Sequence, residues 1–198
     1  HHIRSTFYNG FCSCKYETNV GVAMSNFRFI EKNIDVSNIL ADIKPEDWGV
    51  AGTLEGASGE LNPYGFLPLT MAVVKNAGDD AKKTELQQNT PMYYRYKGIR
   101  KWLKTYKLHR HSRAAFFRLA PGDTLARHID EGEYYLTRDR YHLALQGTYE
   151  YTVEDEMHVI EPGTFFWFDN KKYHMSHNNG DIDRLTFVFD VPKGRKNP

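Results

Sequence analysis

Three residues of the chain have the types and the spacing expected of a metal site. His128 and Asp130 are separated by one residue in the stretch RHID, so on an extended strand both side chains face the same way. His174 lies further along the chain, after the aromatic run FFWFD. Two imidazoles and one carboxylate leave open coordination positions on an ion, which is the ligand set of non-haem Fe(II) oxygenases, whereas a structural zinc usually has four protein ligands. We therefore predict that His128, Asp130 and His174 bind Fe(II).

A group of cationic residues is predicted to lie beside that site. Arg184 stands ten residues after His174 in the apolar run RLTFVFDV, where burial of a guanidinium is costly unless an anion pairs with it. Its planar fork can bind a carboxylate through two parallel hydrogen bonds. Arg140 and His142 share a face of the run RYHLAL by the same alternation, so the three side chains could bind a small dicarboxylate beside the metal. Ion pairs with nearby aspartates would instead explain each cation alone. Those aspartates are Asp139, Asp181 and Asp183.

The positions of these residues require a scaffold rich in β-strands. After Ser112 the chain alternates short apolar runs with turns that contain Gly, Pro, Asp or Asn, which is typical of an all-β sandwich or barrel. We predict strands in seven runs: AAFFRL, TLARH, RYHLAL, TYEYTV, MHVI, TFFWF and RLTFVFDV. Alternation puts Phe165, Trp167 and Asp169 on one strand face. That face could point into the barrel, but we favour an ordinary core role for its aromatic residues.

Helices are predicted ahead of these strands, and strands and loops are expected in residues 48–74. Between Asp35 and Ile43 apolar residues recur at helical spacing, and Pro45 ends this helix. A second helix is expected in residues 95–107. Its apolar face is formed by Ile99, Trp102, Leu103 and Tyr106. The polar residues 78–89 are expected to form a surface helix or a mobile loop.

Basic residues cover the other face of the second helix. Between Met92 and Arg113 there are eight basic residues and no acidic one. One interpretation is a surface that contacts the phosphates of a nucleic acid, and another is a solvated helix face that acidic residues elsewhere balance. The formal net charge of the chain is only +1, from 26 Lys and Arg against 25 Asp and Glu. This balance disfavours a dedicated nucleic-acid-binding protein and favours the solvated face.

Composition indicates an ordinary globular protein. The chain has 198 residues, of which 40% are hydrophobic and 14% aromatic, so a substantial core is possible. No stretch approaches the roughly 20 consecutive apolar residues of a membrane span. Cys12 and Cys14 are the only cysteines and cannot form a disulfide framework, so we expect a reducing compartment, the cytoplasm. Residues 1–23, which begin with two histidines, are expected to be a tag or leader or to be disordered.

The second half of the chain resembles a known family. The segments FFRLAPGDTLARHID, RDRYHLAL and EPGTFFWFDNKKYHMSHNNGDIDRLTFVFDV are similar to the aspartyl/asparaginyl β-hydroxylase family of Fe(II)/2-oxoglutarate-dependent oxygenases, which includes cis-proline hydroxylases. The shared motifs are a Leu-x-Pro-Gly turn before the first ligand, an Arg-x-His pair, a Phe-Asp before the second histidine, and an arginine ten residues later. The resemblance covers residues 112–191.

This resemblance implies a mainly β fold, a double-stranded β-helix or cupin-like jelly roll, with flanking N-terminal helices. Residues 24–198 would then form a single oxygenase domain with its jelly-roll core at about 112–191. The implied iron ligands are His128, Asp130 and His174. The implied 2-oxoglutarate-binding residues are Arg184, Arg140 and His142. Because similar animal aspartyl hydroxylases lack the carboxylate ligand, Asp130 makes this chain more similar to the bacterial proline hydroxylases.

We therefore predict an enzyme that uses Fe(II), 2-oxoglutarate and O2 to hydroxylate an unactivated C–H bond. The expected substrate is an amino acid, or an amino-acid side chain in a peptide or protein. One alternative is a cupin-like protein that binds a carboxylate ligand without turnover. Another is an oxygenase that reaches a nucleic-acid-associated substrate through the basic surface at 95–113.

Overall fold

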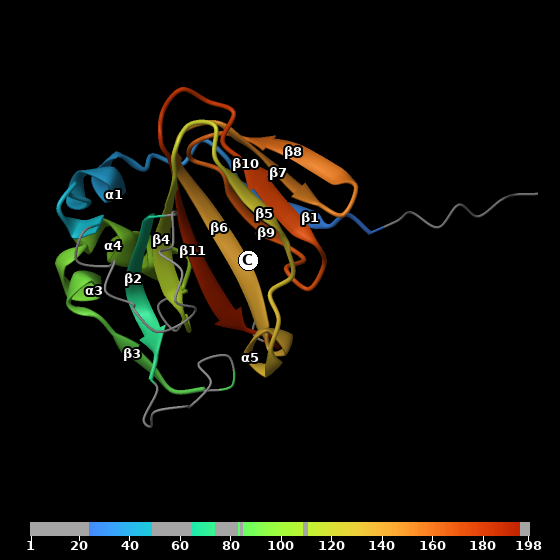
Figure 1. The fold of residues 1–198 in the computed structure, drawn as a ribbon. Coiled ribbons are helices and arrows are strands. Elements are labelled where there is room, and N and C mark those ends of the chain that lie inside the picture. Colours follow the sequence, from blue (N-terminus) through green and yellow to red (C-terminus); the bar gives the residue numbers. More distant parts are fainter. Residues whose placement is uncertain (1–23, 49–64, 74–82, 84, 109–110, 195–198) are drawn as a thin grey trace, which may run out of the picture.

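Strands in two antiparallel sheets are the main secondary structure of the described chain (Figure 1). The structure is a computed structural model. It describes residues 24–48, 65–73, 83, 85–108 and 111–194. The expected leader at 1–23, with Cys12 and Cys14, lies outside the described residues, as do most of residues 78–84. The end of the polar stretch forms a short strand, β3 (Gln87–Asn89).

The larger sheet has seven strands in the order β1-β9-β6-β11-β4-β2-β3. Besides β3, its strands are β1 (Phe27–Glu31), β2 (Gly65–Ala72), β4 (Ala114–Leu119), β6 (Arg138–Gln146), β9 (Phe165–Phe168) and β11 (Arg184–Pro192). The smaller sheet has the order β5-β10-β7-β8. Its strands are β5 (Thr124–His128), β7 (Tyr149–Val153), β8 (Glu156–Ile160) and β10 (His174–His177).

From β4 to β11 the chain passes back and forth between the two sheets. Strands β4, β6, β9 and β11 belong to the larger sheet, and β5, β7, β8 and β10 to the smaller one. The order 9-6-11-4 in one sheet against 5-10-7-8 in the other is a double-stranded β-helix, the cupin-type jelly roll. The predicted fold class is confirmed, and all seven predicted runs form strands. Strands β1, β3 and β10 were not predicted. The helix or loop expected at 78–89 is wrong for Gln87–Asn89, which pair with β2, and β10 was missed because its sequence HMSH is polar.

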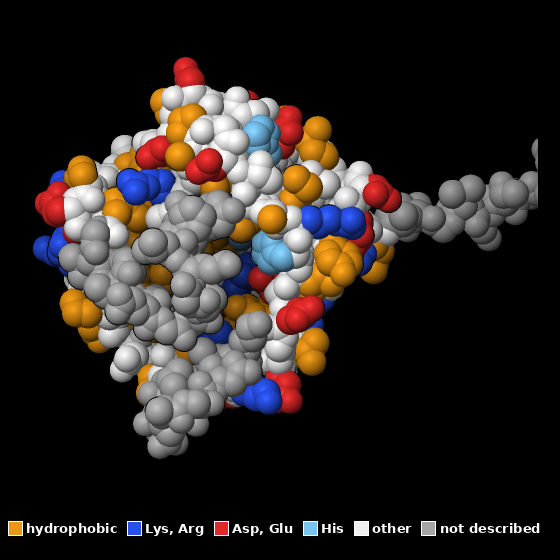
Figure 2. All heavy atoms as spheres, in the orientation of Figure 1, with side chains coloured by type: hydrophobic (Ala, Val, Ile, Leu, Met, Phe, Trp, Pro, Cys, Tyr) orange, Lys and Arg blue, Asp and Glu red, His pale blue; other side chains and the backbone are white. Residues whose placement is uncertain are grey.

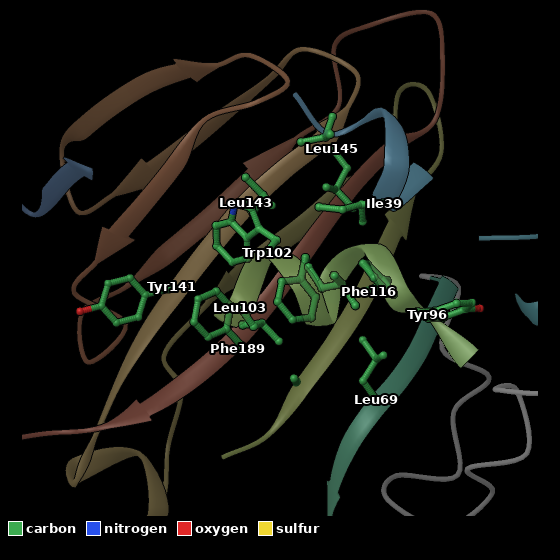
Figure 3. Packing of buried hydrophobic residues seen from close by; sticks show 14 of the residues in the cluster. Ile39, Leu69, Tyr96, Trp102, Leu103, Phe116, Tyr141, Leu143, Leu145 and Phe189 are labelled. Carbon is green, nitrogen blue, oxygen red and sulfur yellow. The ribbon is translucent and has the colours of Figure 1, made fainter. Parts of the chain in front are cut away.

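The larger sheet buries a different set of side chains on each face. On its outer face, Leu143, Phe187 and Phe189 pack against Trp102 and Leu103 in one hydrophobic core (Figure 3). On its inner face, a second core lies between the two sheets. Its buried residues include Ala144, Phe166 and Phe168 from the larger sheet and Tyr149, Tyr151, Val153 and Ile160 from the smaller one. Side-chain alternation along each strand produces these two layers.

Three helices supply the partners of the outer face. They are α1 (Ser37–Asp42), α3 (Pro91–Arg95) and α4 (Lys97–Thr105), and α4 packs against α1 (Figure 1). In α4 the predicted apolar residues Ile99, Trp102 and Leu103 are buried, as expected. A short helix, α5 (Glu133–Leu136), lies between β5 and β6. Within the described residues, no helix has both the length and the apolar character needed to cross a bilayer.

The core role favoured for the aromatic residues Phe165 and Trp167 is confirmed, and their face of β9 does not point into the barrel. Phe165 and Trp167 belong to the outer core, which the helices cover, whereas Phe166 and Phe168 belong to the core between the sheets. Asp169 follows the end of the strand. Alternation identifies which residues share a face, but in a strand with aromatic residues at every position it does not identify the inner face.

Gly163→Ala is expected to destabilise the protein more than Gly122→Ala. Both glycines have a φ of +80°, a conformation that costs another residue about 1–2 kcal/mol. A Cβ at Gly163 would lie 2.6 Å from the carbonyl oxygen of Ile34, whereas one at Gly122 would meet nothing within 4 Å. The clash should add about 1–3 kcal/mol, measured by urea unfolding. Equal losses for the two variants would contradict this close packing of Ile34 on the turn.

Candidate metal centre

Strand pairing brings the two predicted histidine ligands together. β5 and β10 are antiparallel neighbours, and His174 is directly opposite His128 in their register. Their side chains therefore share a face of the smaller sheet, with ring centroids 4.2 Å apart. Asp130 follows just after the end of β5. The potential ligand atoms of His128, Asp130 and His174 all lie within 4.8 Å of one another, a spacing at which they could share one ion.

Backbone carbonyls orient both imidazoles. Nδ1 of His128 lies 2.7 Å from the carbonyl oxygen of Ala126, and Nδ1 of His174 lies 2.9 Å from that of Lys172. A carbonyl oxygen only accepts, so each Nδ1 carries a proton, and in the neutral imidazole the lone pair is then on Nε2. Each Nε2 also lies 3.9 Å from an oxygen of Asp130. Both Nε2 atoms are therefore near the carboxylate, as shared coordination requires.

Burial keeps His174 in the neutral form that a metal ligand needs. Desolvation lowers the pKa of His174 to about 4, although the carboxylate of Asp130 favours the charged form. At neutral pH the Nε2 atom of His174 therefore carries no proton, and its lone pair can bind a metal. A neutral imidazole is the form in which histidine coordinates metals.

Asp130 is ionised and held by two side chains. The guanidinium of Arg140 and the amide of Asn170 donate to its Oδ2 at 2.8 and 2.9 Å. Burial by itself would raise the pKa of Asp130, but the positive charge of Arg140 and the hydrogen bond from Asn170 outweigh burial and lower this pKa. The residue therefore presents a carboxylate, the form that binds cations.

Arg140 lies between two carboxylates. It is the cross-strand neighbour of Asp190, to which it donates from Nε at 2.8 Å and from Nη2 at 3.1 Å, while Nη1 donates to Asp130. Tyr134 donates to the same Asp190 from its hydroxyl at 3.1 Å. The sequence had suggested Asp139, Asp181 and Asp183 as ion-pair partners of the cations. Because two other carboxylates already engage Arg140, its predicted contact with a co-substrate stays a prediction.

Arg184 differs, because no carboxylate of the described residues lies within ion-pair distance of it. The residue is 4% exposed. It donates to the hydroxyls of Thr186 at 2.9 Å and Ser176 at 2.6 Å, and its guanidinium lies 4.4 Å from the ring centre of Tyr149. Neutral hydroxyls accept its hydrogen bonds but do not compensate its charge. The site therefore contains a buried cation whose charge an incoming anion could balance.

The candidate metal ligands and the cations line one cavity of about 260 Å³ between the sheets. In Figure 2, histidine, basic and acidic side chains come together in the hollow of the visible face. The apolar part of the lining consists of Phe117, Leu119, Leu125, Tyr151, Phe168 and Val188. His142 also lines the cavity, and its buried Nδ1 has no hydrogen-bond partner among the described residues. Burial and then Arg184 hold the pKa of His142 well below its usual value, so its ring is neutral.

The basic helix does not contribute to this cavity. None of the described residues between 95 and 113 is part of its lining. Two acidic residues near α1 instead accept hydrogen bonds from this region: Asp47 from the side chain of Arg95, and Asp42 from the backbone N–H of Gly98. A larger hollow of about 420 Å³ between α1 and α4 has both acidic and basic residues in its lining but no histidine or cysteine.

Sequence reasoning missed several residues of the site. Asp190 interrupts an apolar strand just as Arg184 does, so the same argument could have found it. Asn170, Ser176 and Thr186 gave no such signal, because short polar residues near turns and strand ends are common. Their positions become meaningful only through hydrogen bonds to Asp130 and Arg184.

Comparison with known proteins adds a family and several structural neighbours. A model of the aspartyl/asparaginyl beta-hydroxylase family matches residues 67–193. A comparison with curated proteins found no match. Similar solved structures include a predicted oxalate decarboxylase from Thermotoga maritima, 16% identical, with 47% of this chain and 73% of that one covered and a TM-score of 0.36.

Two further solved structures have cupin in their descriptions. A Cupin 2 conserved barrel domain protein from Salinispora arenicola is 15% identical, with 41% of this chain and 63% of that one covered and a TM-score of 0.33. The cupin domain of Schizosaccharomyces pombe Cnp3 is also 15% identical, with 41% and 56% covered and a TM-score of 0.36.

The strand order and the cavity define a cupin-type double-stranded β-helix protein with a His-Asp-His cluster between its sheets. The family model covers well over half of the chain. The chain therefore belongs to the aspartyl/asparaginyl β-hydroxylase family, and the resemblance seen in the sequence is confirmed.

Replacing Arg140 should destabilise the fold strongly. Arg140→Met leaves Asp130 and Asp190 buried without their cation, so we expect a loss of about 3–5 kcal/mol at neutral pH. The control is Arg127→Met, because Arg127 forms an exposed ion pair with Glu154 that contributes about 1 kcal/mol or less. Chemical denaturation of the metal-free protein measures both. If Arg140→Met lost no more stability than Arg127→Met, the proposed role of the buried ion pairs of Arg140 would be contradicted.

Proposed function

We propose that this protein is an Fe(II)/2-oxoglutarate-dependent hydroxylase. One observation carries the proposal: the His-Asp-His cluster shares a cavity with Arg184, a buried cation that has no carboxylate partner among the described residues. 2-Oxoglutarate has a 2-oxo acid group that can chelate a metal and a distal carboxylate that needs a cation. Its binding site therefore requires a metal with open coordination positions and a cation that no protein carboxylate neutralises. Membership of a hydroxylase family supports the same reaction class.

The residues present fit ferrous iron. Two neutral imidazoles and one carboxylate are the donor set of the non-haem Fe(II) oxygenases. The carbonyls that accept from Nδ1 of His128 and His174 place the lone pair of each neutral ring on Nε2. Asp130 would contribute the anionic ligand. Among the described residues, no further His, Cys, Asp or Glu joins these three ligands. The set therefore favours a site with open coordination positions over a closed structural one.

The same cavity fits a small dicarboxylate. Arg184, with the hydroxyls of Ser176 and Thr186 around it, would bind the distal carboxylate through charge-assisted hydrogen bonds. The neutral ring of His142, whose Nδ1 lacks a partner in the described part of the chain, offers a further polar contact on the cavity wall. A cavity of about 260 Å³ has room for a molecule of this size.

When bound, iron and 2-oxoglutarate would supply the oxidising chemistry that inserts one oxygen atom of O2 into a C–H bond, with succinate and CO2 as the other products. The chain's own residues would orient these groups and exclude water. Phe168, Leu125 and Val188 provide apolar walls that limit solvent around the reacting C–H bond. We propose an amino acid, free or within a peptide, as the substrate.

The two alternatives are weaker. A carboxylate-binding protein without turnover would need Arg184 but would not need a cluster of metal ligands beside it. For a nucleic-acid-associated substrate, the basic residues of α4 would have to act at the cavity, and none of the described ones lines it. Detection of succinate formation distinguishes the hydroxylase from both a passive binder and an inactive relative.

His174→Ala should abolish Fe(II) retention and the conversion of 2-oxoglutarate to succinate, because one of three ligands is lost. The control is His177→Ala on the same strand. Its Nδ1 contacts the hydroxyl of Thr124 and it is outside the cluster, so this variant should keep both properties. Iron content is measured after anaerobic loading, and succinate by mass spectrometry. Unchanged succinate formation by His174→Ala would rule out this metal site.

Arg184→Ala should weaken 2-oxoglutarate binding by about 2–5 kcal/mol, the range for loss of one partner of a buried charge pair. Fe(II) binding should persist, because Arg184 is not a ligand. Arg28→Ala serves as the control, since Arg28 is exposed and contacts Trp167 and Tyr141 on the outer side of the larger sheet. Calorimetric titration with 2-oxoglutarate measures the change. Normal affinity in Arg184→Ala would mean that the co-substrate binds elsewhere.

A further inference from the structure

We infer that Asn170 is a positioning residue that holds the carboxylate of Asp130 in the orientation required for metal binding. This inference rests on the proposed function, in which Asp130 is a metal ligand. Asn170 is 1% exposed, lies in the loop between β9 and β10, and is separated by forty residues from the carboxylate it contacts. It is a polar residue buried where only its hydrogen bonds can compensate the loss of water.

The two oxygens of Asp130 have different surroundings. Oδ2 accepts one hydrogen bond from Asn170 at 2.9 Å and another from Arg140 at 2.8 Å. Two donors can occupy both lone pairs of that oxygen, which also lies 3.9 Å from Nε2 of His174. Oδ1 accepts no hydrogen bond from the described residues and lies 3.9 Å from Nε2 of His128. The two donors thus leave Oδ1 as the oxygen available to an ion.

A neighbouring lysine sets the orientation of the Asn170 amide. Nζ of Lys171 donates to Oδ1 of Asn170 at 2.6 Å and also to the backbone carbonyl of Arg138. An ammonium group has no acceptor, so the amide oxygen must face Lys171 and the amide NH2 must face Asp130. If the amide were flipped, its oxygen would face the carboxylate oxygen of Asp130, and its NH2 group would face the ammonium group of Lys171.

The same loop holds two of the three candidate ligands. The carbonyl of Lys172 accepts the Nδ1 proton of His174, and the carbonyl of Asn170 accepts the backbone N–H of Asp130 at 3.2 Å. These backbone contacts do not depend on the identity of residue 170. Replacement of the Asn170 side chain should therefore loosen the carboxylate while it leaves the loop and His174 in place.

The test is a double-mutant cycle on the Mn(II) affinity of the full chain. The affinity of each protein is measured from the EPR signal of free Mn(II). The four proteins are the unmodified chain, Asn170→Ala, Asp130→Ala and the double variant. Asn170→Ala should weaken Mn(II) binding about 10-fold to 100-fold, the usual effect of removing a residue that orients a ligand. In the Asp130→Ala background the same change should have no further effect, because there is no carboxylate left to orient.

A matched control separates positioning from general destabilisation. Asn178 is also fully buried and donates from its amide to the carbonyls of Leu119 and Ile182. Asn178→Ala should lower the melting temperature without weakening Mn(II) binding. If Asn170→Ala does not fold, Lys171→Met takes its place in the cycle, since it removes the group that orients the amide and should weaken Mn(II) binding only when Asp130 is present.

The outcomes distinguish this inference from the proposed function. If the unmodified chain does not bind Mn(II), or if Asp130→Ala binds it equally well, the metal site itself is wrong. If Asp130→Ala weakens binding but the change at Asn170 does not, the positioning role is overturned and the metal site stands. Equal weakening in both backgrounds also overturns the role, because the effect would not act through Asp130.

Discussion

The site depends on the pairing of buried charges between the two sheets. Arg140 donates to Asp190 on the neighbouring strand β11 and to Asp130 beyond the end of β5, so one guanidinium connects both sheets to the candidate metal ligand. Without this cation, two carboxylates would lie in a protein interior where neither could remain ionised at low cost. The lowered pKa of Asp130, and with it the ability of the residue to bind a cation, therefore depends on a residue of another strand.

Two arginines in the same cavity have opposite surroundings. The charge of Arg140 is balanced by two carboxylates, whereas Arg184 is surrounded by hydroxyls and the ring of Tyr149. An anion that binds Arg184 removes an energetic penalty that the ligand-free fold carries, and by linkage it also stabilises the folded state. Under the proposed function, the cavity is thus preorganised for a dicarboxylate, because the cost of burying its cation is part of folding rather than of binding.

The division of each strand into two faces separates the chemistry from the support. The outer face of the larger sheet carries Leu143, Phe187 and Phe189 against the helices, and the inner face of the same strands carries Arg140, His142 and Arg184. A polar cavity can persist there because the apolar core that stabilises the sheet lies mostly on its other side. The basic residues of α4 lie on this helical side, which agrees with their interpretation as a solvated surface and not as part of the site.

The residue types of the site and the strands that carry them could be predicted from the sequence. His128, Asp130, His174 and Arg184 could be selected because metal-ligand spacing and a cation in an apolar strand are local signals, and short apolar runs between turns located the seven predicted strands. The folded chain was needed to show that Phe166 and not Trp167 faces inward, that Arg140 pairs with Asp190, and that Asn170 contacts Asp130. The physical reason is that alternation defines two faces without naming the inner one. The partner of a buried polar group is set by strand pairing and loop paths that join residues forty or fifty positions apart.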